Sequence, residues 1–205
     1  MATAHLWFDP ICPWSWLTSR WLLEVETVRD VTARFHVMSL AVLNEDKPPR
    51  ADGYDEALRE SWGPLRVLTA ADLSFGPDAV RHLYSSIGGL IHQERTPINR
   101  DLYAYALARA DLPHSLANAA TDSFYDHSVR ESHAQAATQT GTDCGTPVLQ
   151  LGRPDGGTAA FFGPVVTPYP RGEAAGRLWD AVALAAATDG FFELKRTRTI
   201  GPDLT

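Results

Sequence analysis

The feature that most constrains the fold of this chain is the uneven distribution of strand patterns along it. Short apolar segments rich in β-branched and aromatic residues occur near both ends, whereas residues 55–140 show mainly helical periodicity. Strands so far apart in sequence bury their apolar faces best by meeting in one sheet. The pattern therefore predicts a mixed α/β protein in which a helical block interrupts a small sheet.

The first part of the chain predicts a β-α-β unit. Residues 5–9 are apolar and aromatic, and Asp9-Pro10 marks a turn after this strand. A helical pattern begins at Pro13, which suits a first helical position because its missing N–H would have no intrahelical partner there. Residues 33–40 are again rich in strand formers. Two strands joined through a helix favour a parallel pair with a right-handed crossover.

The last part predicts a β-β-α unit. Residues 147–151 and 158–162 form two strands around a Gly156-Gly157 turn, and an amphipathic helix covers 171–187. Between the two units, a polar loop at 44–54 is followed by about four to six short helices, separated by Gly- and Pro-containing breaks. One of these breaks is Gly88-Gly89.

These elements predict an α/β fold, namely a thioredoxin fold with a large all-helical insertion between the second and third strands. The expected thioredoxin-fold domain comprises residues 1–50 and 141–205, and the inserted helical subdomain comprises residues 51–140.

Composition narrows the possible partners. The chain has 205 residues and a net charge of −7, and its basic residues form no stripe. A nucleic-acid groove needs clustered Lys and Arg, so nucleic acid is not expected as a partner. The seven histidines show no ligand spacing, and no metal site is expected.

The amino terminus favours a cytoplasmic protein. Residues 1–9 contain neither a basic start nor a long apolar run, so neither a signal peptide nor a membrane span is expected. In that compartment the two cysteines are expected to be thiols rather than a disulfide.

Cys12 is the candidate nucleophile. It lies in Cys12-Pro13-Trp14-Ser15, where the first strand turns into the first helix. A cysteine at this place meets unpaired backbone N–H groups and the positive end of the helix dipole, and both favour the thiolate. Because the thiolate is the reactive form, we expect Cys12 to carry covalent chemistry.

Thr146-Pro147 opens the third predicted strand, where the missing N–H of a proline disturbs the ladder least. In a thioredoxin fold this is the place for a cis proline that faces the cysteine, so both residues are expected to border the site. Cys144 lies three residues before Pro147. It could resolve a Cys12 disulfide if their Cα atoms approached within about 7 Å, and the simpler interpretation is an idle thiol.

A set of segments carries a resemblance to a known family: 7–10 with 12–14, 18–21, 35–40, 145–147, 161–164 and 191–199. Through them the chain resembles the DsbA-like branch of the thioredoxin superfamily, and more closely the actinobacterial mycothiol-dependent nitroreductase family. The resemblance covers nearly the whole chain. It implies that Cys12 attacks disulfides or takes up a small thiol, with mycothiol as co-substrate and no tightly bound cofactor. It also implies that Trp14, Asn44 and Tyr54 line the cleft where thiol and substrate meet.

Ser15 departs from the family's dithiol form, which has a second cysteine at this position. A serine oxygen cannot close a disulfide, so two routes remain for Cys12. In the first, an outside thiol resolves a mixed disulfide, which makes the protein a monothiol oxidoreductase acting on a small apolar substrate. In the second, Cys12 adds reversibly to a conjugated acyl or polyene substrate and so isomerises a double bond without a cofactor.

Other residues were assigned by weaker signals. Ser15 is a candidate hydrogen-bonding partner of Cys12, and Pro13 belongs to the binding motif. Among the histidines, His92 is the candidate for the binding site. His133 is a second histidine that would belong to the site if it lay close to Cys12. A non-catalytic binding protein on the same scaffold is the third hypothesis.

Overall fold

A four-stranded sheet forms the centre of the molecule in the computed structural model, which describes residues 2–50, 53–141 and 143–205. The strands are β1 (Ala2–Phe8), β2 (Val31–Val37), β3 (Val148–Gly152) and β4 (Thr158–Phe162). Their order is β2-β1-β3-β4. Strand β1 pairs parallel with β2 and antiparallel with β3, and β3 pairs antiparallel with β4. This is the predicted topology.

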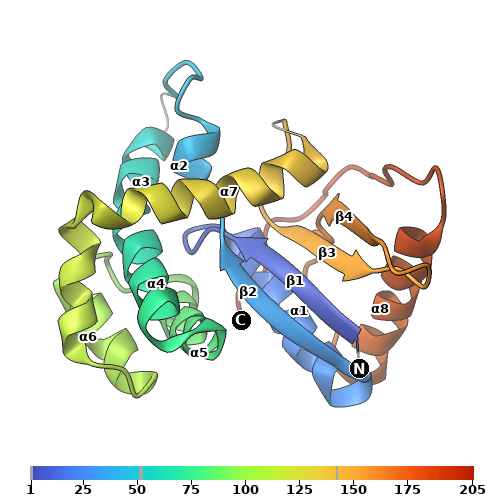
Figure 1. Ribbon diagram of the computed structural model, residues 1–205, viewed down its shortest axis with the longest axis horizontal. Helices are drawn as coiled ribbons and strands as arrows, with labels where there is room; N and C mark the ends of the chain where they lie inside the picture. Colours follow the sequence, from blue (N-terminus) through green and yellow to red (C-terminus); the bar gives the residue numbers. More distant parts are fainter. Residues whose placement is uncertain (1, 51–52, 142) are drawn as a thin grey trace.

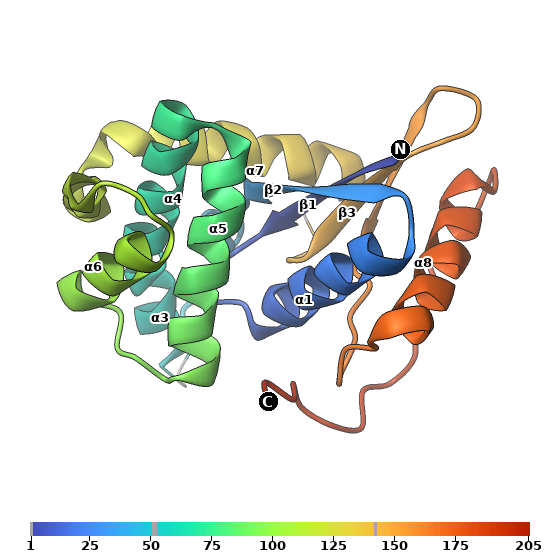
Figure 2. The same ribbon diagram turned by 90° about the horizontal axis from the view of Figure 1, so that it is seen from below.

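The helices lie on both faces of the sheet (Figures 1 and 2). Helix α1 (Pro13–Val28) and helix α8 (Gly172–Ala187) cover one face, where Leu6 and Phe8 are fully buried. The Trp21 indole N–H donates to the Ala175 carbonyl at 3.1 Å and joins the two helices. Because side chains alternate along a strand, one face of β1 packs on α1 and α8, and the other face points away from these helices.

The helical block follows β2, and its elements are α2 (Leu40–Leu43), α3 (Tyr54–Glu60), α4 (Trp62–Phe75), α5 (Pro77–Gly88), η1 (Gly89–Gln93), α6 (Arg100–Arg109), η2 (His114–Thr121), η3 (Ser123–Tyr125) and α7 (Asp126–Thr140). The structure thereby confirms the predicted fold class. Helix α2 was not predicted. It begins because Ser39 accepts a hydrogen bond from the Val42 N–H at its N-terminus.

The expected break or cap at Gly88-Gly89 coincides with the end of α5. Helix α5 continues there into the π-helical turn η1. Gly88 is required by packing, because an added Cβ would lie 2.3 Å from the Trp16 ring. The glycine therefore also marks a close helix–helix approach.

Helix α7 lies across the sheet face opposite α1 (Figure 1). The Ser132 hydroxyl donates to the Val37 carbonyl at 2.7 Å, and Ala136 packs against Trp7 and Val148. A helix assigned to the insertion thus contributes to the core of the sheet. The division into two domains stays a prediction, and its boundary at residue 51 lies outside the described residues.

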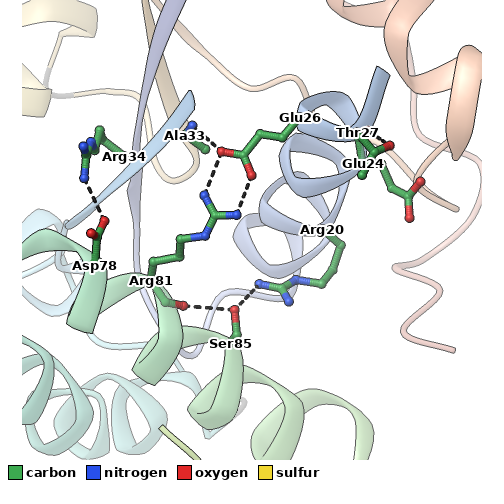
Figure 3. A network of polar contacts seen from close by, with 9 residues as sticks. All are labelled: Arg20, Glu24, Glu26, Thr27, Ala33, Arg34, Asp78, Arg81 and Ser85. Carbon is green, nitrogen blue, oxygen red and sulfur yellow. Dashed lines mark hydrogen bonds and ion pairs between the residues drawn. The ribbon is translucent and has the colours of Figure 1, made fainter. Parts of the chain in front are cut away.

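A group of polar contacts attaches α5 to β2 and α1 (Figure 3). The Glu26 carboxylate accepts hydrogen bonds from the Ala33 N–H at 2.7 Å and from the Arg81 guanidinium at 2.7 Å. Beside it, Arg34 pairs with Asp78 at 2.9 Å. These contacts hold the helical block against the strand that leads to α2.

We expect Glu26→Ala to lower the free energy of unfolding by about 2–3 kcal/mol, because it leaves the Ala33 N–H and a half-buried guanidinium without their acceptor. Urea unfolding measures this loss. Arg109→Ala is the control, since it removes an exposed ion pair with Glu94 and should cost less than about 1 kcal/mol. Equal effects of the two substitutions would show that the Glu26 contacts contribute no more than a surface pair.

Candidate functional site

Cys12 occupies the N-cap position of α1, just beyond the end of β1. Its backbone is extended, with φ −79° and ψ 114°. The Cys12 N–H donates to the Asp9 carbonyl at 3.0 Å, and its own carbonyl accepts from the Trp16 N–H at 3.1 Å. Pro13 follows at the first helical position, and none of the first-turn residues is acidic. The helix therefore begins at the cysteine, as predicted, with no negative charge in its first turn.

The sulfur of Cys12 faces the start of β3. Its Sγ donates to the Thr146 carbonyl at 3.6 Å, and the side chain is 6% exposed. The Thr146–Pro147 peptide bond is cis, as expected for this place in the fold. Cys12, Thr146 and Pro147, which are far apart in sequence, thus meet at one point.

Two hydroxyl groups near the sulfur lack a partner. Ser15 Oγ and Thr146 Oγ1 are both buried, and neither has a hydrogen-bonding partner in the described part of the chain. Buried polar groups are nearly always hydrogen-bonded in native proteins. Unpartnered donors beside a nucleophile are consistent with a site whose polar partner is a bound molecule. Ser15 itself makes no contact with Cys12 Sγ in this structure, contrary to the expected hydrogen bond.

Tyr54 and Asn44 lie on the other side of the cysteine, at the ends of helices α3 and α2. The Asn44 amide donates to the Leu40 carbonyl at 2.7 Å and is hydrogen-bonded to the Tyr54 side chain. Burial raises the pKa of Tyr54, and the nearby Asp9 and Cys12 groups add to this. Of the three residues that the family resemblance assigns to one cleft, Asn44 and Tyr54 are therefore neighbours here.

Trp14 is half-buried on the first turn of α1. The guanidinium carbon of Arg198, from the C-terminal tail, lies 5.1 Å from the centre of its ring. The Trp14 carbonyl accepts from Thr18 Oγ1, which also donates to the Pro164 carbonyl at 2.7 Å. Through these contacts the first turn of α1 is held next to two segments that follow β4, one at Pro164 and one at Arg198.

His92 supports the turn before Cys12. Its Nε2–H donates to the Pro10 carbonyl at 2.9 Å, and its ring stacks on Trp16 at 5.8 Å. Burial lowers the pKa of His92 to about 4, so the ring is neutral at physiological pH. Its ring is thus engaged with the protein itself, and the expected role in binding stays a prediction. His133 lies in α7, and burial lowers its pKa as well.

Sequence reasoning missed Asp9 as part of the site. Its side chain is fully buried, and it accepts hydrogen bonds from the Ile11 N–H at 3.0 Å and the Leu40 N–H at 2.7 Å. Burial raises the pKa of Asp9 to about 7, although the two backbone donors act to lower it. Asp9 thereby connects the turn that carries Cys12 with the helix that ends at Asn44.

Cys144 is half-buried and, like Cys12, is a free thiol. Burial raises the pKa of Cys144, and the carboxylates of Asp143 and Glu193 raise it further. A thiol with a raised pKa contributes less thiolate at neutral pH. These surroundings favour the interpretation of Cys144 as a passive thiol over a resolving one.

In the part of the chain that the structure describes, no three His, Cys, Asp or Glu side chains are grouped closely enough to hold a metal ion. None of the described helices combines the length and apolar character needed to span a bilayer.

The chain is similar to proteins of known sequence and structure. The sequence model of the Rv2466c-like family, described as mycothiol-dependent nitroreductase Rv2466c, matches residues 11–196. The uncharacterized protein Rv2286c of Mycobacterium tuberculosis is 29% identical, over 97% of this chain and 84% of that protein.

Two solved structures share the fold. The cytosolic disulfide reductase DsbM from Pseudomonas aeruginosa has a TM-score of 0.59 and 19% identity, over 90% of this chain and 100% of that chain. A 2-hydroxychromene-2-carboxylate isomerase has a TM-score of 0.61 and 14% identity, over 89% of this chain and 93% of that chain. At these identities the likeness concerns the DsbA-like thioredoxin fold alone.

Proposed function

This chain belongs to the Rv2466c-like family of mycothiol-dependent nitroreductases, and on this premise we propose that it is a monothiol oxidoreductase that uses Cys12 and mycothiol. The substrate is a small molecule with an apolar body. The observation that carries the proposal is the position of Cys12 Sγ, which lies at the start of α1 and faces Thr146, with a serine at the family's second cysteine position.

The reaction consists of two thiol–disulfide exchanges. The Cys12 thiolate attacks one sulfur of a disulfide, forms a mixed disulfide and releases the other sulfur as a thiolate. A mycothiol thiolate then attacks the mixed disulfide, forms a new disulfide and returns Cys12 as the thiolate. Each turn of the cycle leaves Cys12 unchanged, so the electrons come from the outside thiol. Ser15 supports this order because its hydroxyl cannot perform the second attack.

A cofactor-free cis–trans isomerase is the second candidate. Addition of the Cys12 thiolate to a conjugated double bond gives a single bond, rotation follows, and elimination restores the thiolate and the double bond. A lone cysteine beside Ser15 favours this chemistry too, because it requires no second thiol. Turnover of a polyene acid in thiol-free buffer, with unchanged product mass, would distinguish it from the redox reaction.

The mixed disulfide is the test of the proposal. After exposure to mycothiol disulfide, intact-protein mass spectrometry is expected to show wild type with one added mycothiol, while Cys12→Ala shows none. Ser15→Cys should lose the adduct and two hydrogens, because the new thiol lies on the same helical turn as Cys12 and displaces mycothiol.

Cys144→Ala is the matched control and is expected to keep the adduct of wild type, since Cys144 has the less reactive thiol. An adduct that persists in Cys12→Ala, or that disappears in Cys144→Ala, would place the reactive sulfur at Cys144 and contradict the proposal.

A further inference from the structure

The chain after α8 forms an anchored strap. Residues 191–201, here called the C-terminal strap, contain neither helix nor strand, and the tail passes β4 and turns back towards the middle of the molecule (Figure 1). Phe191 packs edge-on against Phe161, with ring centres 5.8 Å apart. At the other end, the Thr167 hydroxyl donates to the Gly201 carbonyl at 3.3 Å and accepts from the Asp203 N–H at 2.8 Å. Both ends of the strap are therefore fixed to the protein.

Between these anchors the strap passes the Cys12 site. Glu193 is near Cys144, which precedes the cis proline that faces Cys12. Five residues later, the Arg198 guanidinium lies over the Trp14 ring at 5.1 Å. The strap thus extends from the loop before β3 to the first turn of α1, which are the two segments that border the sulfur.

The strap carries positive charge that the protein does not neutralise. Lys195, Arg196 and Arg198 form no ion pair with any described carboxylate, although the chain as a whole has a net charge of −7. Half of the other arginines are paired: Arg29, Arg34, Arg66, Arg81, Arg109, Arg130 and Arg153. The first turn of α1 contains no acidic residue either. The strap therefore brings three cations without an ion-pair partner among the described residues to the segments that border the nucleophile.

We infer that Arg198 binds a carboxylate on the second substrate, with Lys195 and Arg196 adding to the local positive potential. This inference rests on the proposed function, because it assigns the substrate of the same cysteine. The Trp14 face attracts the guanidinium and orients it, which leaves its N–H edge free for a two-point contact with a carboxylate. Mycothiol is an uncharged thiol, so the recognised charge belongs to the other substrate.

The inferred substrate class is thus a small apolar or aromatic acid. Its carboxylate contacts Arg198, its body lies against Trp14, and its reacting atom reaches Cys12 Sγ.

Two aromatic disulfides of different charge test the inference. Dithiobis(nitrobenzoate) carries a carboxylate on each ring, whereas dithiodipyridine is neutral, and both transfer an aryl thiol to a reactive cysteine. We would measure the rate constant for Cys12 modification in a Cys144→Ala background, so that one thiol reports. Arg198→Gln is expected to slow the reaction with the carboxylate probe about tenfold and to leave the neutral probe unchanged.

Arg100→Gln is the matched control, because it removes the same charge at the start of α6. Arg100→Gln should change neither rate. In the protein that keeps Arg198, added salt should lower the rate with the charged probe relative to the rate with the neutral probe. If Arg198→Gln left the ratio of the two rates unchanged, or if Arg100→Gln changed it equally, the inference would be overturned while the proposed function stood. If Cys12 reacted with neither probe, the proposed function itself would fail.

Discussion

Cys12→Ala is expected to lower thiol-dependent turnover at least about a thousandfold, which is the scale on which enzymes lose activity when their nucleophile is removed. The reason is chemical, because both the redox reaction and the isomerisation form a covalent bond to Cys12 Sγ. The residual positioning by Trp14 and Tyr54 can bind a substrate without transforming it. Steady-state kcat/KM with mycothiol as reductant measures the loss.

Cys12→Ser separates chemistry from structure. The serine hydroxyl can still donate to the Thr146 carbonyl, as the thiol does, and its smaller side chain fits the same buried place. A hydroxyl does not ionise near neutral pH, however, so we expect the serine variant to be as inactive as alanine. Unfolding midpoints of both variants should stay close to wild type, which shows that the loss is not one of folding.

Cys144→Ala provides the control for this result. Cys144→Ala removes the other thiol, whose surroundings raise its pKa, so this variant should keep the turnover of wild type. If Cys12→Ala retained turnover in the presence of thiol, both mechanisms that form a covalent bond to Cys12 would be excluded.

The parts of the fold that could be predicted from sequence are those with local signals. A proline at the first helical position and a proline at a strand start are visible in the sequence itself, and they located Cys12 and Pro147 at the two ends of one contact. The alternation of apolar residues likewise predicted β1 and its neighbours. The helical character of residues 55–140 was recognised, but periodicity does not specify which face of which element a helix such as α7 covers.

The parts that were missed depend on contacts between distant segments. Asp9 was interpreted as a turn residue because Asp-Pro is typical of turns, whereas its burial depends on the Leu40 N–H, from the segment after β2. Gly88 was interpreted only as part of a helix break or cap, whereas it also admits the Trp16 ring. The strap that carries Arg198 has no periodicity, so its position beside Trp14 had no signal in the sequence.

Asp9 is expected to make the stability of the protein depend on pH. In the folded state burial raises the pKa of this carboxyl to about 7 from an ordinary value of 3.8. Between these two values the folded state therefore binds more protons than the unfolded state, so the free energy of unfolding contributed by Asp9 falls as pH rises. The contribution is complete below about pH 4 and is lost by about pH 7, and its size is about 4 kcal/mol.

Asp9→Asn removes the titration and tests this dependence. Asparagine is uncharged at every pH, as the protonated Asp9 carboxyl of wild type is near pH 4, so the variant removes the ionisation at nearly the same side-chain volume. The free energy of unfolding of wild type relative to the variant should fall as pH rises to 7 and then stay constant, because only wild type has to ionise a buried carboxyl.

The informative quantity is the difference between the two proteins, measured by urea unfolding at half-unit steps from pH 4 to pH 8. Burial lowers the pKa of His36 and of His92 to about 4, so in the folded state these rings bind fewer protons than unfolded histidines, and their contribution to stability rises between about pH 4 and pH 6.5. This opposite slope occurs in both proteins and cancels in the difference. Parallel curves for wild type and Asp9→Asn would mean that Asp9 ionises at its ordinary pKa despite its burial, and the predicted pH dependence would be wrong.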